Sequence, residues 1–503
     1  MTNTVTPFAP MNISDLIAGD FFMPPEWDRA FNHIVIDSRD VQPGDLFVAR
    51  HGHNAHGEQH ISDAVERGAV AVLAEGDQGF RCEWTAEGDS VPVFIQPEVA
   101  THLTAWLHRR YPLDAMHLIA VTGTNGKSSV TQYIAQLASA CDESCGVLGT
   151  LGNGCWPDLK PTRNTTPDLT VILQNLNALQ QQQVNLAAME VSSHGLAQQR
   201  VAGLNFDVAI LTNLTQDHLD YHGTMADYFA AKRCLFTDYG VRKAIINIDD
   251  EYGRRLAADA DIAADIITFG HSSEADVQYR ALSMAADGMT AQLTSPWGEA
   301  EFRLPLIGEF NLANAVAAVC ALAAHGMDFQ ALIAALPTLH PVAGRMELYV
   351  KDNSPLAVVD FAHTPDALMN VLQALKPWQC QITCVFGCGG DRDRAKRPLM
   401  AEAAVQHADQ VWLTDDNPRT EDPQQIFADA LAGSKDIAQQ HDRKTAIAEA
   451  IANTNPDGIV LIAGKGHENY QEINGVKLPY SDASVLAALG YQAAAAVTGE
   501  ADA

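Results

Sequence analysis

A glycine-flanked lysine near residue 127 is the strongest chemical signal in the sequence. In VTGTNGKSSV, the residues Gly123, Gly126, Lys127 and Ser128 follow an apolar run and precede a helical pattern. Glycines let backbone N–H groups close on a polyphosphate, a lysine neutralises its charge, and a serine hydroxyl can bind Mg²⁺. The spacing departs from the standard P-loop, because two residues stand between the glycines instead of four. A bare glycine turn would need neither the lysine nor the serine, so we predict ATP binding.

A carboxylate and two histidines downstream are candidates for a metal site. Glu190 ends the apolar run NLAAME, and a side chain at the end of a strand projects into the crevice beyond the sheet. Glu190 is therefore a candidate Mg²⁺ ligand. His218 and His222, in TQDHLDYHG, are four residues apart and are flanked by aspartates. An ordinary surface histidine and a ligand beside ATP both fit this pattern, and the sequence leaves the two open.

Lys232 lies on the inner face of a predicted helix. In MADYFAAKRCLF, Tyr228 and Phe236 are each four residues away from it, so the three side chains share one stripe. Burial disfavours the ammonium form of a lysine, and a neutral amine can react with carbon dioxide to form a carbamate. The alternative is a lysine whose stem covers apolar surface while its charge reaches water.

Two other patterns suggest chemistry that the sequence argues against. The run Ser192-Ser193-His194 resembles a nucleophile with its base, but adjacent residues rarely face each other as a catalytic triad requires. Cys380, Cys384 and Cys388 are spaced evenly in a β-rich run. On a strand, neighbouring thiols of this spacing lie roughly 13 Å apart, too far to share one metal ion. We therefore expect neither a hydrolase triad nor a cysteine metal cluster.

The candidate residues follow strands of a predicted α/β fold with three domains. Residues 1–100 contain short β-rich runs between turns, which indicates a small N-terminal α/β domain. In residues 101–340, the runs HLIAVTG, NLAAMEVS, DVAILTN and KAIINID alternate with helical segments, as in a parallel-sheet domain. Residues 341–503 repeat the pattern with PLAVVDFAH, QITCVFGCGG, QVWLTDDN and GIVLIAGKG. Each run ends in a polar or glycine-rich loop, so the loops of this Rossmann-like domain should converge on one crevice.

Length and charge limit the possible partners. A chain of 503 residues is too long for one hydrophobic core. A formal net charge of -30 at pH 7 would repel a phosphate backbone or an anionic lipid surface. Neither nucleic acid nor a membrane is therefore an expected partner. The sequence lacks an apolar run of about 18 residues and a signal-peptide pattern, so we expect a cytoplasmic protein.

Motifs along nearly the whole chain resemble the Mur ligase family. They are TGTNGKSS, EVSSHGL, TNLTQDHLDYHGT with DYFAAKRCLF, GEFNLANAVAA, GRME, VDFAHTPD, GCGGDRDRAKRP, DDNPRTEDP and AGKGHENYQ, in the order and spacing typical of that family. Within it, the chain is similar to the member that adds the third residue of the peptide. Ser128-Ser129 stands where Thr-Thr is common, and Phe361 where Tyr is usual.

The resemblance implies three groups of binding residues. The UDP-muramoyl dipeptide would be bound by Ile36, Ser38, His53, Asn54, Ala55, Asn164, Thr165, Thr166, Ser192, Gln198 and Arg200. ATP would be bound by Gly123, Thr124, Asn125, Gly126, Lys127, Ser128, Ser129, Asn311 and Arg345. Mg²⁺ would be held by Ser128, Glu190, His218 and Lys232, the last as a carbamate (N6-carboxylysine). The incoming amino acid would be bound by Arg392, Asp416, Asn417, Pro418, Arg419, Gly464 and Glu468.

The implied reaction joins meso-diaminopimelate to the D-glutamate γ-carboxylate of UDP-N-acetylmuramoyl-L-Ala-D-Glu through an acyl phosphate. Lys127, Glu190, His218 and Lys232 would be the catalytic residues of an enzyme that we expect to be a monomer. The alternatives are the same reaction with L-lysine, a folylpolyglutamate synthetase-like ligase, and a non-enzymatic scaffold switched by nucleotide. The first-domain elements DSR and HGHNAHG argue against a folate ligase, because by resemblance they serve uridine.

Arg419 is the residue that favours diaminopimelate over lysine. It lies in the loop after the run VWLT, and a loop at the carboxyl end of a strand faces the ligand crevice. Diaminopimelate carries a second carboxylate that lysine lacks, and an arginine fork can bind that group with paired hydrogen bonds. A surface arginine beside Glu421 is the alternative interpretation.

Overall fold

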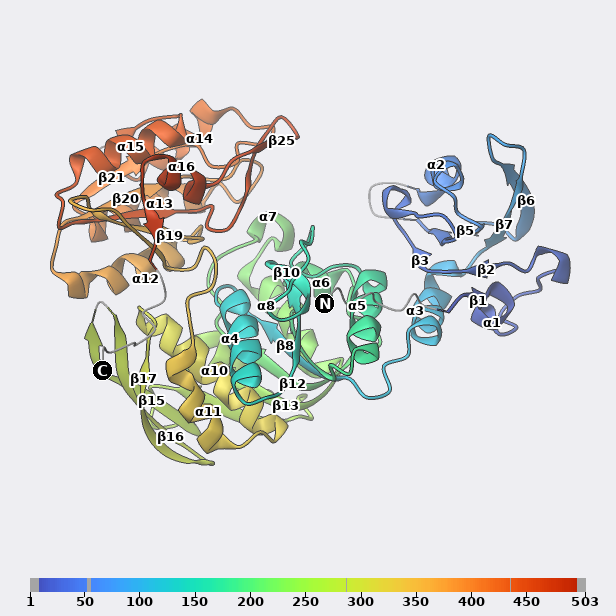
Figure 1. Cartoon of the computed structure of the whole chain (residues 1–503), viewed down its shortest axis with the longest axis horizontal. Coiled ribbons are helices and arrows are strands. Elements are labelled where there is room, and N and C mark those ends of the chain that lie inside the picture. The colour runs from blue at the N-terminus through green and yellow to red at the C-terminus, as the bar shows by residue number, and fades with distance from the viewer. Residues whose placement is uncertain (1–8, 52–55, 286, 435, 495–503) are drawn as a thin grey trace. The chain divides into compact units, whose positions relative to one another are not determined.

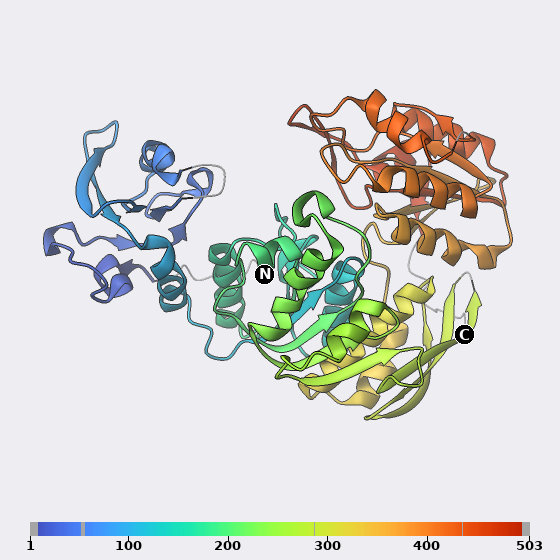
Figure 2. The same ribbon diagram turned by 180° about the vertical axis from the view of Figure 1, so that it is seen from behind.

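The computed structural model describes residues 9–51, 56–285, 287–434 and 436–494. These residues form a three-domain α/β protein, as the sequence predicts, with a separate larger sheet in each domain (Figure 1 and, from behind, Figure 2). The chain divides into two compact units. The first combines residues 1–116, 167–185 and 198–204, and the second comprises the remaining segments. The predicted domain limits at residues 100 and 340 stay a prediction.

The N-terminal unit is built on a mostly parallel sheet. Within its described residues, the strand order is β3-β4-β5-β7-β6, and only β6 is antiparallel to its neighbour. The elements are β1 (Met11–Asn12), α1 (Ile13–Ile17), η1 (Pro25–Trp27), β2 (Ala30–Phe31), β3 (Ile34–Val35), η2 (Ser38–Asp40), β4 (Leu46–Ala49), η3 (Gly57–His60), α2 (Ile61–Glu66), β5 (Ala71–Glu75), β6 (Gly79–Trp84), β7 (Ser90–Gln96), α3 (Val99–Arg110) and α5 (Leu169–Gln181).

Helix α5 belongs to this unit although the strands before and after it belong to the central sheet. Its Gln174 side chain donates to the carbonyl oxygen of Ile34 at 3.0 Å and to the Tyr111 hydroxyl at 3.2 Å. Asn177 donates to the carbonyl of Pro112 at 2.7 Å. The first unit therefore takes part of its structure from a later stretch of the chain.

The central sheet carries the glycine-rich loop. Over the described residues, its order is β10-β9-β11-β8-β12-β13-β14-β15-β16-β17. The strands from β9 to β15 in that order are parallel, and antiparallel strands extend both edges. The strands are β8 (His117–Thr122), β9 (Cys145–Gly149), β10 (Gly152–Cys155), β11 (Leu186–Glu190), β12 (Asn205–Leu211), β13 (Gly240–Asn247), β14 (Asp265–Gly270), β15 (Val277–Ala285), β16 (Gly288–Ser295) and β17 (Gly298–Leu304).

Helices cover this sheet and close its core. They are α4 (Lys127–Ala140), α6 (Ser193–Ala197), α7 (Leu219–His222), α8 (Met225–Thr237), α9 (Glu251–Ala257), α10 (Glu309–His325), α11 (Phe329–Ala335) and η4 (Leu336–Thr338). The α10 sequence is apolar on nearly all sides, and the helix is buried along most of its length against α4. This packing fixes α4 behind the loop that ends β8.

The C-terminal domain repeats the parallel arrangement. Its order across the described residues is β22-β21-β20-β23-β19-β18-β26, parallel from β22 to β19. Its elements are β18 (Glu347–Val350), β19 (Leu356–Asp360), α12 (Pro365–Leu375), η5 (Lys376–Trp378), β20 (Ile382–Phe386), α13 (Lys396–His407), β21 (Gln410–Leu413), α14 (Pro423–Leu431), β22 (Ala438–Gln439), α15 (Arg443–Asn453), β23 (Ile459–Ala463), β24 (Tyr470–Ile473), β25 (Val476–Pro479), α16 (Asp482–Ala488) and β26 (Gln492–Ala493). The carboxyl ends of β20, β21 and β23 meet at one sheet edge, as expected for neighbouring parallel strands.

No helix in the ranges that the structure describes is long and apolar enough to cross a membrane.

Candidate active site

The loop after β8 closes tightly on the neighbouring strand and helix. Gly123 and Gly126 have φ angles of +147° and +87°, which favour glycine. A Cβ atom on Gly123 would lie 1.9 Å from Thr212 Oγ1, and one on Gly126 would lie 2.5 Å from Asn314 Oδ1. Helix α4 begins at Lys127, directly after this turn, so its N-terminal N–H groups are available to an anion. This is the geometry of a phosphate-binding loop.

Two lysines reach this loop from different helices. Lys127 Nζ donates to the carbonyls of Gly123 and Thr124, both at 2.9 Å. Lys232 Nζ, on α8, donates to the Gly123 carbonyl at 2.8 Å. The Lys232 side chain is buried beside Tyr228 and Phe236, which confirms its predicted inward direction. Burial, together with the charge of Lys127, holds the pKa of Lys232 well below its usual value and favours the neutral amine.

Glu190 lies at the end of β11 within a cluster of hydroxyl groups. Its Oε1 accepts from the Thr150 backbone N–H at 2.7 Å. Its Oε2 accepts from Ser128 Oγ at 3.1 Å and from Thr150 Oγ1 at 3.2 Å. The Ser128 hydroxyl and the Glu190 carboxylate are hard oxygen donors of the kind that Mg²⁺ prefers, so this pair fits the metal. Among the described residues no three His, Cys, Asp or Glu side chains form a ready-made metal cluster.

His218 is held in its neutral form. It adopts a left-handed backbone conformation, with φ +56°, at the start of α7. Burial lowers the pKa of His218 to about 3, although the neighbouring Asp217 carboxylate opposes the shift. A neutral imidazole is the form that can ligate a metal. His222 instead lies 3.0 Å from the Ser193 hydroxyl, and Ser193 is 1% exposed, too buried to act as a nucleophile.

Arg345 and Asn311, which are predicted to contact the nucleotide, are placed differently in the structure. Arg345 Nη2 lies 3.5 Å from Ser128 Oγ, and its guanidinium carbon is 4.3 Å from the centroid of the Phe361 ring. Phenylalanine therefore supplies the cation–π contact at this position. Asn311 is buried and bonds to Tyr133 and to the carbonyl of Ile307. Asn314, one turn further along α10, is the residue that contacts the loop.

Asn314 and Thr150 are site residues that sequence analysis does not select. Asn314 lies in the same FNLAN segment as Asn311. It is three residues further on, so the two side chains lie near each other on one helix, and this spacing could have identified Asn314 as a site residue. Thr150 directly follows β9, a strand whose end lies beside that of β11. A search for polar residues after every predicted strand would have found it.

The predicted dipeptide-binding residues form two groups. Thr166 Oγ1 donates to the Glu190 carbonyl at 2.8 Å and lies 3.0 Å from Ser192 Oγ, while Thr165 Oγ1 accepts from Thr150. The carbonyl of Asn164 accepts from Thr162, so this residue lies in the turn just before them. In the N-terminal unit, Arg200 donates to Gln198 Oε1 at 2.6 and 3.0 Å.

The predicted uridine-binding residues lie after β3 and β4. Ile36 is half-buried and Ser38 is buried in η2. His53, Asn54 and Ala55 lie outside the described residues.

The strand-end loops of the C-terminal domain gather charged groups around a buried lysine. Lys465, which is 0% exposed, donates to Asn417 Oδ1 and Glu468 Oε2, both at 3.0 Å, and lies 3.6 Å from Asp416 Oδ1. Asn417 Nδ2 donates to Glu468 Oε2 at 2.9 Å. Gly464, with φ +114°, passes close to Asp416, since a Cβ there would lie 2.6 Å from Asp416 Oδ2. Lys465 was not predicted, although it stands between glycines at the end of a predicted strand.

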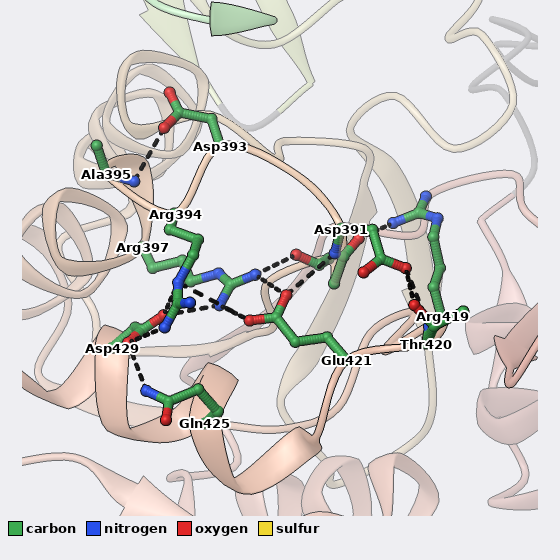
Figure 3. Close-up of polar contacts among 12 residues, drawn as sticks. Asp391, Asp393, Arg394, Ala395, Arg397, Arg419, Thr420, Glu421, Gln425 and Asp429 are labelled. Carbon is green, nitrogen blue, oxygen red and sulfur yellow. Dashed lines mark hydrogen bonds and ion pairs between the residues drawn. The ribbon is translucent and has the colours of Figure 1, made fainter. Parts of the chain in front are cut away.

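Arg419 contacts the glycine turn that precedes Arg392 in the chain (Figure 3). Arg419 Nη1 donates to the Gly390 carbonyl at 2.7 Å, and its Nε lies 3.7 Å from Glu472 Oε2. A Cβ on Gly389 would lie 3.0 Å from Arg419 Nη1 and 3.6 Å from Arg392 Cγ. Side-chain atoms of both arginines therefore lie next to Gly389. Pro418 shapes the same surface, because its carbonyl would be 1.9 Å from a Cβ on Gly390.

Three family models match consecutive parts of the chain. The "Mur ligase family, catalytic domain" model matches residues 30–113, the "Mur ligase middle domain" model matches residues 121–322, and the "Mur ligase, glutamate ligase domain" model matches residues 344–466. Each matches most of one of the three sheets described above.

Relatives match over almost the full length of the chain. The UDP-N-acetylmuramoyl-L-alanyl-D-glutamate--2,6-diaminopimelate ligase of Pseudomonas aeruginosa is 44% identical over 480 residues, covering 94% of this chain and 96% of that protein. A solved structure of a ligase with the same name has a TM-score of 0.63 and 36% identity, and the match covers 96% of this chain and 100% of that one.

A more distant structure shares the fold. The MurF ligase of Thermotoga maritima, solved in complex with ADP, has a TM-score of 0.64 and 19% identity, covering 88% of this chain and 95% of that one. The family matches together with the 44% identical relative confirm the resemblance carried by the motifs. The chain belongs to the Mur ligase family.

Proposed function

We propose that this protein joins meso-2,6-diaminopimelate to the D-glutamate γ-carboxylate of UDP-N-acetylmuramoyl-L-Ala-D-Glu, with ATP converted to ADP and phosphate. The observation that carries the proposal is the C-terminal cluster of Asp416, Asn417, Arg419 and Glu468 at the strand ends of a ligase-family domain. It combines carboxylates for an amino group with a guanidinium for a distal carboxylate. The 44% identical relative, whose name states this reaction, supports it.

ATP is the proposed nucleotide, bound by the loop between β8 and α4. Lys127 supplies positive charge beside the polyphosphate, and the N-terminal N–H groups of α4 add donors. Thr124, Asn125 and Ser129 belong to the same loop and helix start, and Arg345 approaches it through Ser128. Asn311 supports this region through Tyr133.

Mg²⁺ is the proposed metal, and its proposed ligands are Ser128, Glu190, His218 and carbamylated Lys232. When bound, the ion would neutralise phosphate charge and lower the barrier to phosphoryl transfer. The carbamate would form when the neutral Lys232 amine attacks carbon dioxide and loses a proton. It replaces a cation by an anion in a buried position, which suits a divalent metal.

The proposed reaction has two steps and needs no covalent enzyme nucleophile. The glutamate γ-carboxylate attacks the γ-phosphorus of ATP, giving an acyl phosphate and ADP. The amino group of diaminopimelate then attacks the acyl carbon, loses a proton and expels phosphate. The chain contributes by holding the reactants in place and by stabilising developing negative charge at Lys127.

Diaminopimelate recognition is assigned to the C-terminal cluster. Arg419 and Arg392, which both lie next to Gly389, would bind the distal carboxylate. The oxygens of Asp416 and Glu468 would accept from its ammonium group, and Asn417 would orient Glu468. Pro418 and Gly464 shape the backbone around this pocket.

The remaining assignments concern the UDP-linked substrate, the cellular location of the enzyme and its oligomeric state. Its uridine end is assigned to the N-terminal residues Ile36, Ser38 and His53–Ala55, and its dipeptide end to Asn164, Thr165, Thr166, Ser192, Gln198 and Arg200. ATP and UDP-sugars are cytoplasmic metabolites, so we propose a cytoplasmic enzyme. We further propose that it acts as a monomer.

A substrate-omission assay tests the proposal. Phosphate release is measured with ATP, Mg²⁺, the UDP-muramoyl dipeptide and diaminopimelate, and then with each component left out in turn. We expect phosphate release only in the complete mixture, together with a UDP-muramoyl tripeptide identified by mass spectrometry. Product formed with L-lysine in preference to diaminopimelate, or with a folate and glutamate, would assign a different ligase activity. ATP turnover without any acceptor would support the scaffold alternative.

A further inference from the structure

A buried arginine holds the glycine turn, Gly389–Gly390, that Arg419 contacts. Arg397, in the first turn of α13, is 0% exposed. Its Nη1 donates to Glu421 Oε1 at 2.7 Å and to Asp429 Oδ2 at 2.8 Å, and its Nη2 donates to Glu421 Oε2 at 2.6 Å. Figure 3 shows this guanidinium between the two carboxylates. We call Arg397, Glu421 and Asp429 the arginine clasp.

The clasp holds the turn on both sides of Gly390. Arg397 Nη2 also donates to the Gly389 carbonyl at 3.2 Å. Glu421 Oε2 accepts from the backbone N–H of Asp391 at 3.1 Å. The backbone groups that flank Gly390 are therefore fixed by two members of one ion pair.

Gly390 in turn fixes the guanidinium of Arg419. Its carbonyl accepts from Arg419 Nη1 at 2.7 Å, and its N–H donates to the Asn417 carbonyl at 2.9 Å. Asp391 adds a second link, since its Oδ2 accepts from the Thr420 N–H at 3.0 Å and from the Thr420 hydroxyl at 2.9 Å. The loop after β20 and the loop after β21 are thus joined directly beside the Arg419 side chain.

We infer that Arg397 is a positioning residue that sets amino-acid specificity, because it places the Gly390 carbonyl on which Arg419 is oriented. The inference rests on the proposed function, in which Arg419 binds the distal carboxylate of diaminopimelate. A buried ion pair recovers its cost of desolvation only with well-placed partners, and an apolar replacement is often as stable. The clasp is therefore better explained by the geometry that it imposes than by stability.

Arginine is required for this geometry, and lysine would not replace it. The planar guanidinium contacts both Glu421 oxygens, Asp429 and the Gly389 carbonyl at once, whereas an ammonium is a point charge without a fork. An arginine on the surface provides a matched control. Arg394 binds the same Asp429 carboxylate, at 2.9 and 3.0 Å, but its side chain is 57% exposed.

The test compares Arg397→Lys, Glu421→Gln and the control Arg394→Gln in the full-length enzyme. For the first two, we expect the KM for diaminopimelate to rise about 10- to 100-fold, as for a misplaced binding group. The preference for diaminopimelate over L-lysine should fall by a similar factor, while the KM for ATP and the KM for the UDP-muramoyl dipeptide stay unchanged. The Arg394→Gln enzyme should behave like the wild type in all four measurements.

The outcomes separate this inference from the proposed function. If the wild type does not use diaminopimelate, the proposed function fails and the inference fails with it. If the wild type uses it and both clasp variants fold with unchanged KM and preference, only the inference is overturned. A KM increase for all three substrates, or loss of folding in both variants, would assign Arg397 a purely structural role and would also overturn it.

Discussion

The side-chain Nζ atoms of Lys127 and Lys232 donate to the same atom, the carbonyl oxygen of Gly123, at 2.9 and 2.8 Å. Burial lowers the pKa of both lysines, and the charge of Lys127 lowers the pKa of Lys232 further, although the Asp217 carboxylate opposes both shifts. We therefore propose that this loop receives negative charge, from a polyphosphate at Lys127 and from a carbamate at Lys232.

Replacing Lys127 should abolish most of the turnover. Lys127→Ala removes the charge that would stabilise the transferring phosphoryl group, and loss of one such donor costs about 2.7 to 4 kcal/mol, or about 100- to 1,000-fold in kcat. Steady-state phosphate release measures the effect. Lys243→Ala, which removes an exposed lysine paired with Asp265, should leave kcat unchanged. Near-normal turnover in Lys127→Ala would exclude the proposed role.

Lys232 should carry a carbamate that depends on its own amine. In ¹³C-bicarbonate, we expect a carbamate carbon signal in the NMR spectrum of the wild type and none in Lys232→Met. Lys232→Arg should also be inactive, because a guanidinium keeps the positive charge and does not form the carbamate. A labelled signal that persists in Lys232→Met, or an active Lys232→Arg enzyme, would show that this modification is not at Lys232.

Arg419 should determine the choice between diaminopimelate and lysine. Arg419→Ala removes a guanidinium that would pair with the distal carboxylate, at a cost of about 2 to 5 kcal/mol, or about 30-fold to several thousand-fold in specificity. The ratio of kcat/KM for diaminopimelate over L-lysine should collapse by that factor, while the KM for ATP stays the same. Competition between the two amino acids in one reaction, followed by mass spectrometry, measures the ratio directly. A variant that keeps the wild-type ratio would contradict the assignment.

His467 should make the fold less stable in mild acid. Burial, helped by the charge of Arg345, lowers the pKa of His467 to about 4. In the unfolded chain the imidazole titrates near 6.5, so between these two values the unfolded state binds more protons. The free energy of unfolding should therefore fall as the pH drops below about 6.5, by about 3 kcal/mol from this residue once the pH is below both pKa values.

The measurement is urea unfolding of the wild type and His467→Gln at about pH 7 and about pH 4.5. Other groups titrate in both proteins, so the informative quantity is the difference between them. The stability of His467→Gln relative to the wild type should rise in acid. A difference that does not change with pH would contradict the neutral, buried state of this histidine.

Much of the candidate site follows from local sequence rules. Glu190 lies at the end of a strand because the apolar run before it has strand length, and Lys232 is inward because Tyr228 and Phe236 share its helical stripe. The loops of the C-terminal domain converge because their strands are parallel neighbours. Each of these inferences needs only the spacing of apolar residues within a helix or strand and the residue at which that element ends.

The remainder depends on contacts between distant segments. Asn311 and Asn314 lie on the same helix, and only packing against α4 decides that Asn314 contacts the loop while Asn311 bonds to Tyr133. Sequence analysis does not select Lys465, because its place in the cluster depends on bonds to Asn417 and Glu468, which come from other parts of the strand-end loops. The antiparallel strands β16 and β17 were not predicted, because the alternation of apolar and polar residues in a strand does not reveal that it extends a parallel sheet.

The return of α5 to the N-terminal unit has a consequence for synthesis of the protein. A ribosome releases the chain from its N-terminus at about 5 to 20 residues per second. Ile34 and Tyr111, whose backbone N–H and hydroxyl bond to each other at 3.1 Å, are therefore made several seconds before Gln174, the side chain that donates to both. During that interval the nascent first unit lacks one of its helices and exposes the surface that α5 later covers. A ribosome-bound chain that stops near residue 116 is a natural client for chaperones, whereas one extended beyond residue 204 has every segment of that unit.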